Sequence, residues 1–204
     1  KPTHLAVAFD TRAPTPRHKL YPEYKANREE MPEDLAIALP TLKRLCQAFR
    51  IPVLEIDGYE ADDIIGTLAH RADAEGDIET FMVTPDKDFG QLISETSVMW
   101  KPGRRGNDHE VVDLPALRKF WEIDRAEQVI DILGLMGDKS DNIPGIPGVG
   151  EKTAKKLVAE WGSVENLLEN TDSLKAKLKE RVIEHAEQAR PSKKPATLML
   201  DVPV

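Results

Sequence analysis

The sequence contains a single cysteine, Cys46, among 204 residues. One thiol cannot form a disulfide within the chain, so the sequence indicates a protein of a reducing compartment. Helical spacing places Cys46 on one face with Leu35, Leu39, Leu42 and Phe49. We expect that face, including the cysteine, to pack into the core.

Long apolar runs are also missing. No stretch approaches about 18 residues, the length that a membrane-spanning helix needs, and the first residues do not read as a secretory signal. These absences argue against the membrane and secreted classes and predict a cytoplasmic protein. With 40% apolar and 31% charged residues, we expect one globular unit of one or two domains with a real core.

An overall basic charge is missing as well. The formal net charge of −8 argues at first against a nucleic-acid partner, because phosphates are usually met by a basic surface. Placement outweighs the total, since acids around metal ions are neutralised when the cations bind. The lysines are grouped where a DNA backbone can lie: Lys152, Lys155 and Lys156, then Lys175, Lys177 and Lys179. The second group fits an ordinary solvated helix face equally well.

Short apolar runs predict strands at 4–9, 52–56 and 80–84, and residues 98–113 predict a hairpin that turns at 103–107. Between them, residues 32–49 have helical periodicity. Strands that alternate with helices favour a parallel α/β sheet. After about residue 113 the pattern becomes helical, so we expect an α/β domain at 1–113 and a helical domain at 114–204.

The segment 134–158, GLMGDKSDNIPGIPGVGEKTAKKLV, is the most informative part of the chain. Its prolines and glycines exclude a continuous helix over 142–150 and predict a tight hairpin. The hairpin tip leaves backbone amides uncovered, and a lysine-rich helix follows, so amides, helix dipole and lysines can converge on one phosphate. We expect a helix-hairpin-helix that binds the DNA backbone through Gly148, Val149, Gly150, Lys152, Thr153, Lys155 and Lys156.

A nucleotide-binding P-loop is an alternative for the same segment, because Gly145 and Gly150 have the right separation. A P-loop places its lysine directly after the second glycine and follows a hydrophobic strand. Here Glu151 intervenes and a proline-broken segment precedes, so the spacing fails. The other alternative is a plain connector between two helices.

Eight acidic residues occupy positions that one sheet edge can bring together. Six follow the predicted strands, at the edge where open α/β sheets bind ligands, and two stand before the hairpin, three residues apart and able to face one centre. Each alone is typical of a turn or a helix start. Together they would repel unless divalent cations neutralise them. They are Asp10, Glu60, Asp62, Asp63, Asp86, Asp88, Asp138 and Asp141.

Oxygen ligands favour Mg²⁺ or Mn²⁺ over zinc, because the five histidines are scattered and form no cluster with cysteine. Two such ions about 3.5 to 4 Å apart would activate a water and stabilise the leaving oxygen of a phosphodiester. Two ions carry four positive charges against eight carboxylates, so some acids must act through bound water or support other ligands.

Four segments resemble the successive motifs of the 5′-nuclease domain of bacterial DNA polymerase I. They are VAFD with PEYKANR, GYEADDIIGTLA, VTPDKDFGQL, and MGDKSDNIPGIPGVGEKTAKKL. The resemblance runs from residue 9 nearly to the end. It implies a PIN-like parallel-sheet nuclease core with a helical arch, followed by an all-helical helix-hairpin-helix domain.

The same resemblance implies a 5′ to 3′ exonuclease and flap endonuclease of replication and repair. Its metal ligands would be the eight acids, and Lys25 and Arg28, at the start of the arch, would contact the scissile phosphate. It also implies a K⁺ ion at the hairpin, DNA substrates with 5′ flaps, nicks or gaps, covalently linked polymerase domains and a place at the bacterial nucleoid.

Members of that family begin with a hydrophobic strand ending in Asp-Gly, which supplies a further metal ligand. The 204 residues do not contain this strand, so we expect a nuclease core without its central strand. Two other functions stay open. One is a non-catalytic DNA-binding module that uses only the hairpin, and the other is a free-standing flap endonuclease paralogue.

Overall fold

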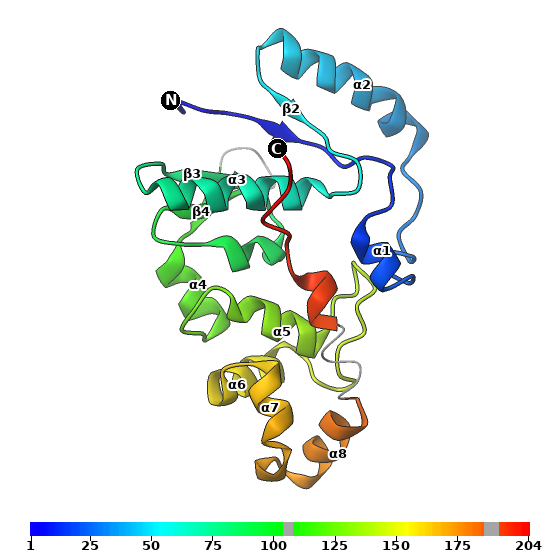
Figure 1. The fold of residues 1–204 in the computed structure, drawn as a ribbon, viewed down its shortest axis with the longest axis vertical. Helices are drawn as coiled ribbons and strands as arrows, with labels where there is room; N and C mark the ends of the chain where they lie inside the picture. The colour runs from blue at the N-terminus through cyan, green and yellow to red at the C-terminus, as the bar shows by residue number, and fades with distance from the viewer. Residues whose placement is uncertain (104–107, 186–191) are drawn as a thin grey trace.

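The computed structural model describes residues 1–103, 108–185 and 192–204. Strands and helices alternate up to residue 112, and among the described residues after it the regular elements are helices, as the sequence predicts (Figure 1). The first part consists of β1 (Val7–Ala8), α1 (Pro16–Leu20), α2 (Glu33–Ala48), β2 (Val53–Leu54), α3 (Ala61–Glu75), β3 (Thr80–Val83), the 3₁₀ helix η1 (Lys87–Leu92), β4 (Ser97–Pro102) and β5 (His109–Val112). The second part consists of α4 (Leu114–Trp121), α5 (Gln128–Met136), α6 (Glu151–Trp161), α7 (Val164–Glu169), η2 (Thr171–Ser173) and α8 (Ala176–Glu184).

The predicted parallel pairing is present, but the sheet is in two parts. β1 pairs with β2 in parallel, with Val7 opposite Val53. β3 pairs with β4 in parallel, and β5 completes the second part as an antiparallel neighbour of β4. Within the described residues no ladder joins β1 to β3. The predicted hairpin is therefore formed by β4 and β5, and residues 104–107 of its turn lie outside the described residues.

α3 carries two of the eight predicted acids, Asp62 and Asp63, and a third, Glu60, is its N-cap. Its first turn is closed by a capping box between Glu60 and Asp63, and it ends at Gly76, which has a φ of +81°. Ile64, Thr67 and Ala69 form its buried face against β3 and η1. The amide groups of its first turn point toward the ends of the neighbouring strands, where acidic side chains are favoured.

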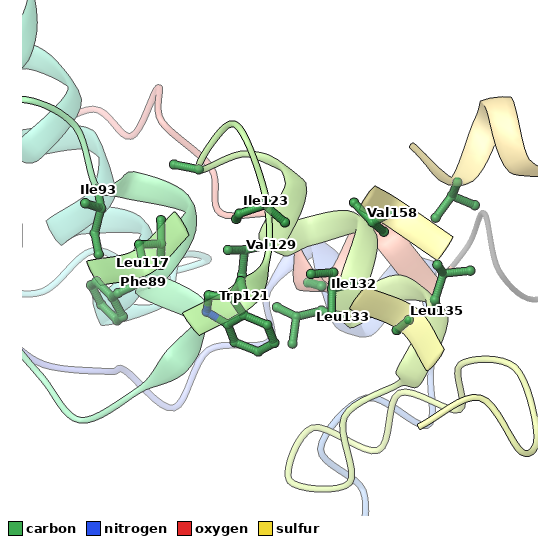
Figure 2. Close-up of a cluster of buried hydrophobic side chains, with 14 of the residues drawn as sticks. Phe89, Ile93, Leu117, Trp121, Ile123, Val129, Ile132, Leu133, Leu135 and Val158 are labelled. Atoms are coloured by element: carbon green, nitrogen blue, oxygen red, sulfur yellow. The ribbon is translucent and has the colours of Figure 1, made fainter. Parts of the chain in front are cut away.

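One hydrophobic core joins the two parts of the chain. Figure 2 shows Phe89 of η1, Leu117 of α4, Val129 and Leu133 of α5, and Val158 of α6 in a single cluster. These side chains are almost fully buried. The boundary that we predict at residue 113 therefore marks a change of secondary structure, and the core is continuous across it.

After a helical turn at residues 192–196 the chain runs back along α3, and we call residues 195–204, which include the end of that turn, the C-terminal strap (Figure 1). Thr67 of α3 accepts a hydrogen bond from the Val202 amide at 3.2 Å and donates one to the Met199 carbonyl at 3.3 Å. Arg71, one turn further along, donates to two more strap carbonyls. Side chains of α3 thus hold the strap along this helix.

α2 departs from expectation, because none of its residues is buried. Cys46 is half-buried, and Leu35, Leu42 and Phe49 are exposed, Phe49 at 71%. The prediction that this face of α2 packs into the core is therefore wrong. Periodicity shows which side chains share a face but not whether another element covers it, and α2 packs mainly on the short strand β2. Within the described ranges, no helix is long and apolar enough to span a membrane.

Candidate active site

The acids predicted at the strand ends do lie there. Asp10 follows β1 and accepts a hydrogen bond from the Ala61 amide at 2.7 Å, which ties the end of β1 to the start of α3. Asp86 follows β3, begins η1 and accepts from the Asp88 amide at 3.0 Å. Backbone hydrogen bonds thus fix Asp10 at the end of β1 and Asp86 at the end of β3.

Burial and neighbouring carboxylates raise the pKa of two of these acids. Burial, followed by the charges of Asp86 and Asp10, raises the pKa of Asp62 to about 7. Burial also raises the pKa of Asp88 to about 6, with Asp86 and Asp138 adding to the rise and Lys87 opposing it. Like charges have this effect only at close range, so the ends of β1 and β3 and the start of α3 form one acidic surface.

Tyr24 joins two further acids to this surface. Its hydroxyl lies 3.1 Å from Oε2 of Glu60 and 3.0 Å from Oδ2 of Asp141, and it donates its hydrogen to one of them. The ring is 3% exposed. Burial and the two carboxylates raise the pKa of Tyr24, so the hydroxyl stays protonated and available as a donor. Tyr24 therefore connects α3 with the loop that precedes the hairpin.

Lys25 and Arg28 pair with two of the same acids. Lys25 Nζ donates to Glu60 Oε1 at 2.7 Å, and its amide donates to the Asp141 carbonyl at 3.0 Å. Arg28 is exposed, and its Nη2 donates to Asp141 Oδ1 at 2.6 Å. Both cations can reach an acid and solvent, which is the geometry that contact with a phosphate requires.

Asp138 and Asp141 take different neighbours, although the sequence predicts that they face one centre. Asp138 forms an ion pair with Lys87 of η1 and accepts from the Ser140 amide at 2.7 Å. Asp141 faces Tyr24 and Arg28 instead. Asp138 therefore extends the acidic surface beside η1, and Asp141 extends it beside Tyr24 and Arg28.

Asp63 is separated from the other acids by its partners. Its side chain is fully buried, and both oxygens accept hydrogen bonds from Arg17 of α1, at 2.7 and 2.6 Å. Burial alone would raise the pKa of Asp63, but the Arg17 guanidinium and the amides of Met199 and Glu60 hold it below its usual range. The structure thus places seven of the eight predicted acids on the shared surface and Asp63 behind it.

The hairpin has the predicted form, with α5 and α6 on either side. Gly148 and Gly150 are exposed, and Gly148 has a φ of +78°. Lys152 and Lys156 are exposed beside them and Thr153 is half-buried. These residues form an open surface of backbone and lysine that suits a phosphate backbone.

Two predicted contact residues of the hairpin require correction. The Lys155 side chain is buried, because its ammonium donates to the Phe120 carbonyl at 2.7 Å and lies 4.1 Å from the centre of the Phe120 ring. It closes the end of α4 and is not open to a phosphate. Val149 is 3% exposed and its amide donates to the Ile146 carbonyl at 2.9 Å, so neither its side chain nor its amide is open to a phosphate.

Three candidate residues were not predicted. Tyr24 and Lys87 bridge the acids, and Arg181 of α8 lies over the hairpin, where a Cβ on Gly148 would come within 2.5 Å of its Nη1. Tyr24 and Lys87 stand inside motifs, next to Lys25 and Asp88, so adjacency was the available signal. Arg181 is far from the hairpin in sequence, and no local signal indicates it.

The acidic surface fits hard divalent cations by its chemistry. All of its potential ligands are carboxylate oxygens, the donors that Mg²⁺ and Mn²⁺ prefer, and their mutual repulsion is what a cation would relieve. Within the described ranges, however, no three His, Cys, Asp or Glu side chains are grouped as a ready-made metal site. Lysine, arginine and tyrosine side chains lie between the acids, so side chains must move before several carboxylates share an ion.

An α/β core with this acidic edge, followed by a helical domain, is the fold of a PIN-like nuclease. Residues 1–122 match the family model described as 5′-3′ exonuclease, N-terminal resolvase-like domain. Residues 125–204 match the model described as 5′-3′ exonuclease, C-terminal SAM fold. The chain therefore belongs to the 5′-3′ exonuclease family.

Similar proteins include DNA polymerase I of Bacillus caldotenax, 46% identical over 205 residues that cover all of this chain and 23% of the relative. The thermostable DNA polymerase I of Thermus filiformis is 43% identical over 201 residues, covering 98% of this chain and 23% of the relative. The chain thus spans about a quarter of the length of these relatives.

Two solved structures share the fold. The T5 D15 protein co-crystallised with metal ions has a TM-score of 0.77 at 22% identity, covering 95% of this chain and 75% of that chain. The catalytic core of Rad2 in complex with DNA substrate has a TM-score of 0.57 at 16% identity, covering 95% of this chain and 68% of that chain. These likenesses confirm the predicted nuclease architecture.

Proposed function

We propose that this chain is the catalytic part of a structure-specific nuclease that hydrolyses phosphodiester bonds of 5′ flaps and nicked duplex DNA. The observation that carries the proposal is that Lys25 and Arg28 are paired with two members of the acidic surface, Glu60 and Asp141. A cluster of acids without cations beside it would fit a site for a structural metal ion. Acids beside cations that can exchange a carboxylate for a phosphate suit phosphodiester chemistry.

We infer that the acidic surface binds two Mg²⁺ or Mn²⁺ ions. Bound there, the ions would supply an activated water and stabilise the leaving oxygen. A T5 5′-exonuclease structure with bound divalent zinc supports a divalent metal in this fold. The ligands would be Asp10, Glu60, Asp62, Asp86, Asp88, Asp138 and Asp141.

The chain's own residues position the substrate. Lys25 and Arg28 would move from Glu60 and Asp141 to the scissile phosphate, and Tyr24 would keep these two acids at a fixed spacing. The exposed glycines and lysines of the hairpin would hold the duplex by its backbone, without reading sequence. The Rad2 core, solved with a DNA substrate, supports DNA as the partner.

We further infer that the chain acts as a domain of DNA polymerase I in replication and repair, in the bacterial cytoplasm at the nucleoid. Matches to DNA polymerase I that cover all or nearly all of this chain support this assignment. Polymerase domains would then be covalently linked partners. A free-standing paralogue would differ in the length of its gene product.

The test is cleavage of end-labelled DNA by the protein with its natural flanking sequence. A 5′ flap should be cut near its junction in the presence of Mg²⁺, whereas blunt duplex of the same sequence should be cut far more slowly. Asp86→Asn should abolish cleavage, and Glu95→Gln, which changes an exposed acid outside the acidic surface, should not. A wild-type protein that binds the flap but never cuts it would show a non-catalytic DNA-binding module.

A further inference from the structure

Arg17 is enclosed between α1, α3 and the C-terminal strap, with 4% exposure. Its Nη1 and Nη2 donate to the two oxygens of Asp63. Nε and Nη2 donate to the strap carbonyls of Pro195 and Thr197, at 3.0 and 2.8 Å. Nη1 also lies 3.5 Å from Oε2 of Glu60. All five N–H groups of this guanidinium therefore have an oxygen to face.

The carboxylate of Asp63 likewise has all of its acceptor positions filled by hydrogen bonds. Oδ1 accepts from Arg17 and from the Met199 amide at 2.9 Å, and Oδ2 accepts from Arg17 and from the Glu60 amide at 3.1 Å. A carboxylate offers about four lone-pair positions in all. No position is left for a metal ion, and the side chain is fully buried.

The strap that this pair holds also contacts the second acid-bearing element. Gln91 of η1 donates to the Ala196 carbonyl at 3.0 Å and accepts from the Leu198 amide at 3.0 Å. The strap therefore joins the start of α3, which carries Glu60 and Asp62, to η1, which carries Asp88.

We propose that Arg17 and Asp63 are a positioning pair, which fixes the metal-binding start of α3 against the strap, and that Asp63 is not itself a metal ligand. The bidentate geometry holds α3 in rotation as well as in distance, because a planar guanidinium and a planar carboxylate match in one orientation. The effect on turnover rests on the proposed nuclease function.

Asp63→Asn keeps the shape of the side chain but replaces one acceptor with a donor that faces Arg17. We expect it to lower the single-turnover cleavage rate by roughly tenfold to a hundredfold, because small misplacement of reacting groups has effects of that size. Arg17→Met should match it, and Arg17→Lys, which keeps the charge, should lose less. The Kd for the flap and the Mg²⁺ concentration at half-maximal rate should stay within about threefold of wild type.

Arg71→Met is the matched control. Arg71 is an exposed α3 arginine that donates to the Val202 and Val204 carbonyls of the strap but to none of the acids. Its replacement should leave the cleavage rate within about twofold, since only the far end of the strap is released. An equal loss in Arg71→Met would show that any loosening of the strap suffices, and would overturn a specific role for the pair.

A measurement without metal tests the pair independently of cleavage. In EDTA, Asp63→Ala should speed hydrogen exchange at the Met199 amide by at least about tenfold, because its charged acceptor is lost. Arg71→Met should leave exchange at Met199 unchanged. Should Arg17→Met fail to fold, Arg17→Lys carries the kinetic test.

The result that overturns the proposal is an Asp63→Asn protein that needs at least about tenfold more Mg²⁺ while Arg17→Lys needs no more than wild type. That outcome would make Asp63 a metal ligand. Unchanged exchange at Met199 in Asp63→Ala would likewise refute the pair. If the wild type cuts no flap, the nuclease function fails, and the exchange measurement still decides whether the pair holds the strap.

Discussion

Asp62→Asn should make the metal-free protein more stable while it removes a candidate metal ligand. Burial, then the charges of Asp86 and Asp10, raise the pKa of Asp62 to about 7. A carboxyl group whose pKa is higher in the folded than in the unfolded chain has no effect at low pH, where both states are protonated, and it costs stability as the pH rises from the unfolded to the folded pKa. Above pH 7 the ionised side chain opposes folding, and a neutral asparagine of the same shape does not.

The size of the effect follows from the pKa. One pKa unit corresponds to about 1.4 kcal/mol, so a rise from 3.8 to about 7 sets an upper limit of roughly 4 kcal/mol at pH 8. Asp62 is only half-buried, and solvent screening should leave about 1 to 2 kcal/mol. In a chain of 204 residues, that corresponds to a rise in Tm of roughly 2 to 8 °C.

Thermal unfolding followed by circular dichroism in EDTA measures this directly. The gain should be largest at pH 8 and shrink as the pH falls from 7 toward 4, because both proteins then carry a neutral side chain. Mg²⁺ should raise the Tm of the wild type more than that of the variant. Glu95→Gln is the control for removal of an exposed acid. A Tm that is unchanged or lower at pH 8 would refute the crowding of acids at this edge.

Three further predictions concern the hairpin and Tyr24. Lys155→Met should lower the free energy of unfolding in urea by about 1 to 3 kcal/mol without changing DNA affinity. Lys152→Met should instead reduce the salt slope of duplex binding by about one, and the opposite pattern would contradict the placement of the two lysines. Gly148→Val should weaken duplex binding by roughly tenfold in fluorescence anisotropy, because a branched side chain strains a positive φ and meets Arg181; unchanged affinity would make the hairpin a connector. Tyr24→Phe should slow flap cleavage by about tenfold with unchanged flap affinity, and an equal rate would show that the hydroxyl does not space the acids.

The sequence predicts the positions of the strand ends well, because short apolar runs that stop at an acid or a proline are local signals. β3 was expected at 80–84 and is Thr80–Val83, and the acid after it, Asp86, begins η1 as a cap. The hairpin was equally predictable, since glycine and proline act on their own backbone. Such features need no knowledge of distant residues.

The misses at Lys155 and Asp63 depend on contacts across the chain. Lys155 was grouped with its neighbours by charge, but it lies three residues before the buried Val158 and finds the Phe120 carbonyl of another helix. Asp63 was grouped with Asp62 by adjacency, yet consecutive residues of a helix point in different directions, and Asp63 turns toward Arg17, which is 46 positions away. The sequence around Lys155 contains no signal for Phe120, and the sequence around Asp63 contains no signal for Arg17.

The dependence of flap cleavage on Asp138 and on Mg²⁺ tests the central claim most directly. The measurement is the single-turnover rate on an end-labelled 5′ flap, for wild type and Asp138→Asn, over a Mg²⁺ titration. We predict that the wild-type rate rises with Mg²⁺ and is absent in EDTA, and that the variant is slower by at least about a hundredfold while it binds the flap with similar affinity. A variant that reaches the wild-type rate at saturating Mg²⁺ would contradict the assignment of this acidic surface as the nuclease active site.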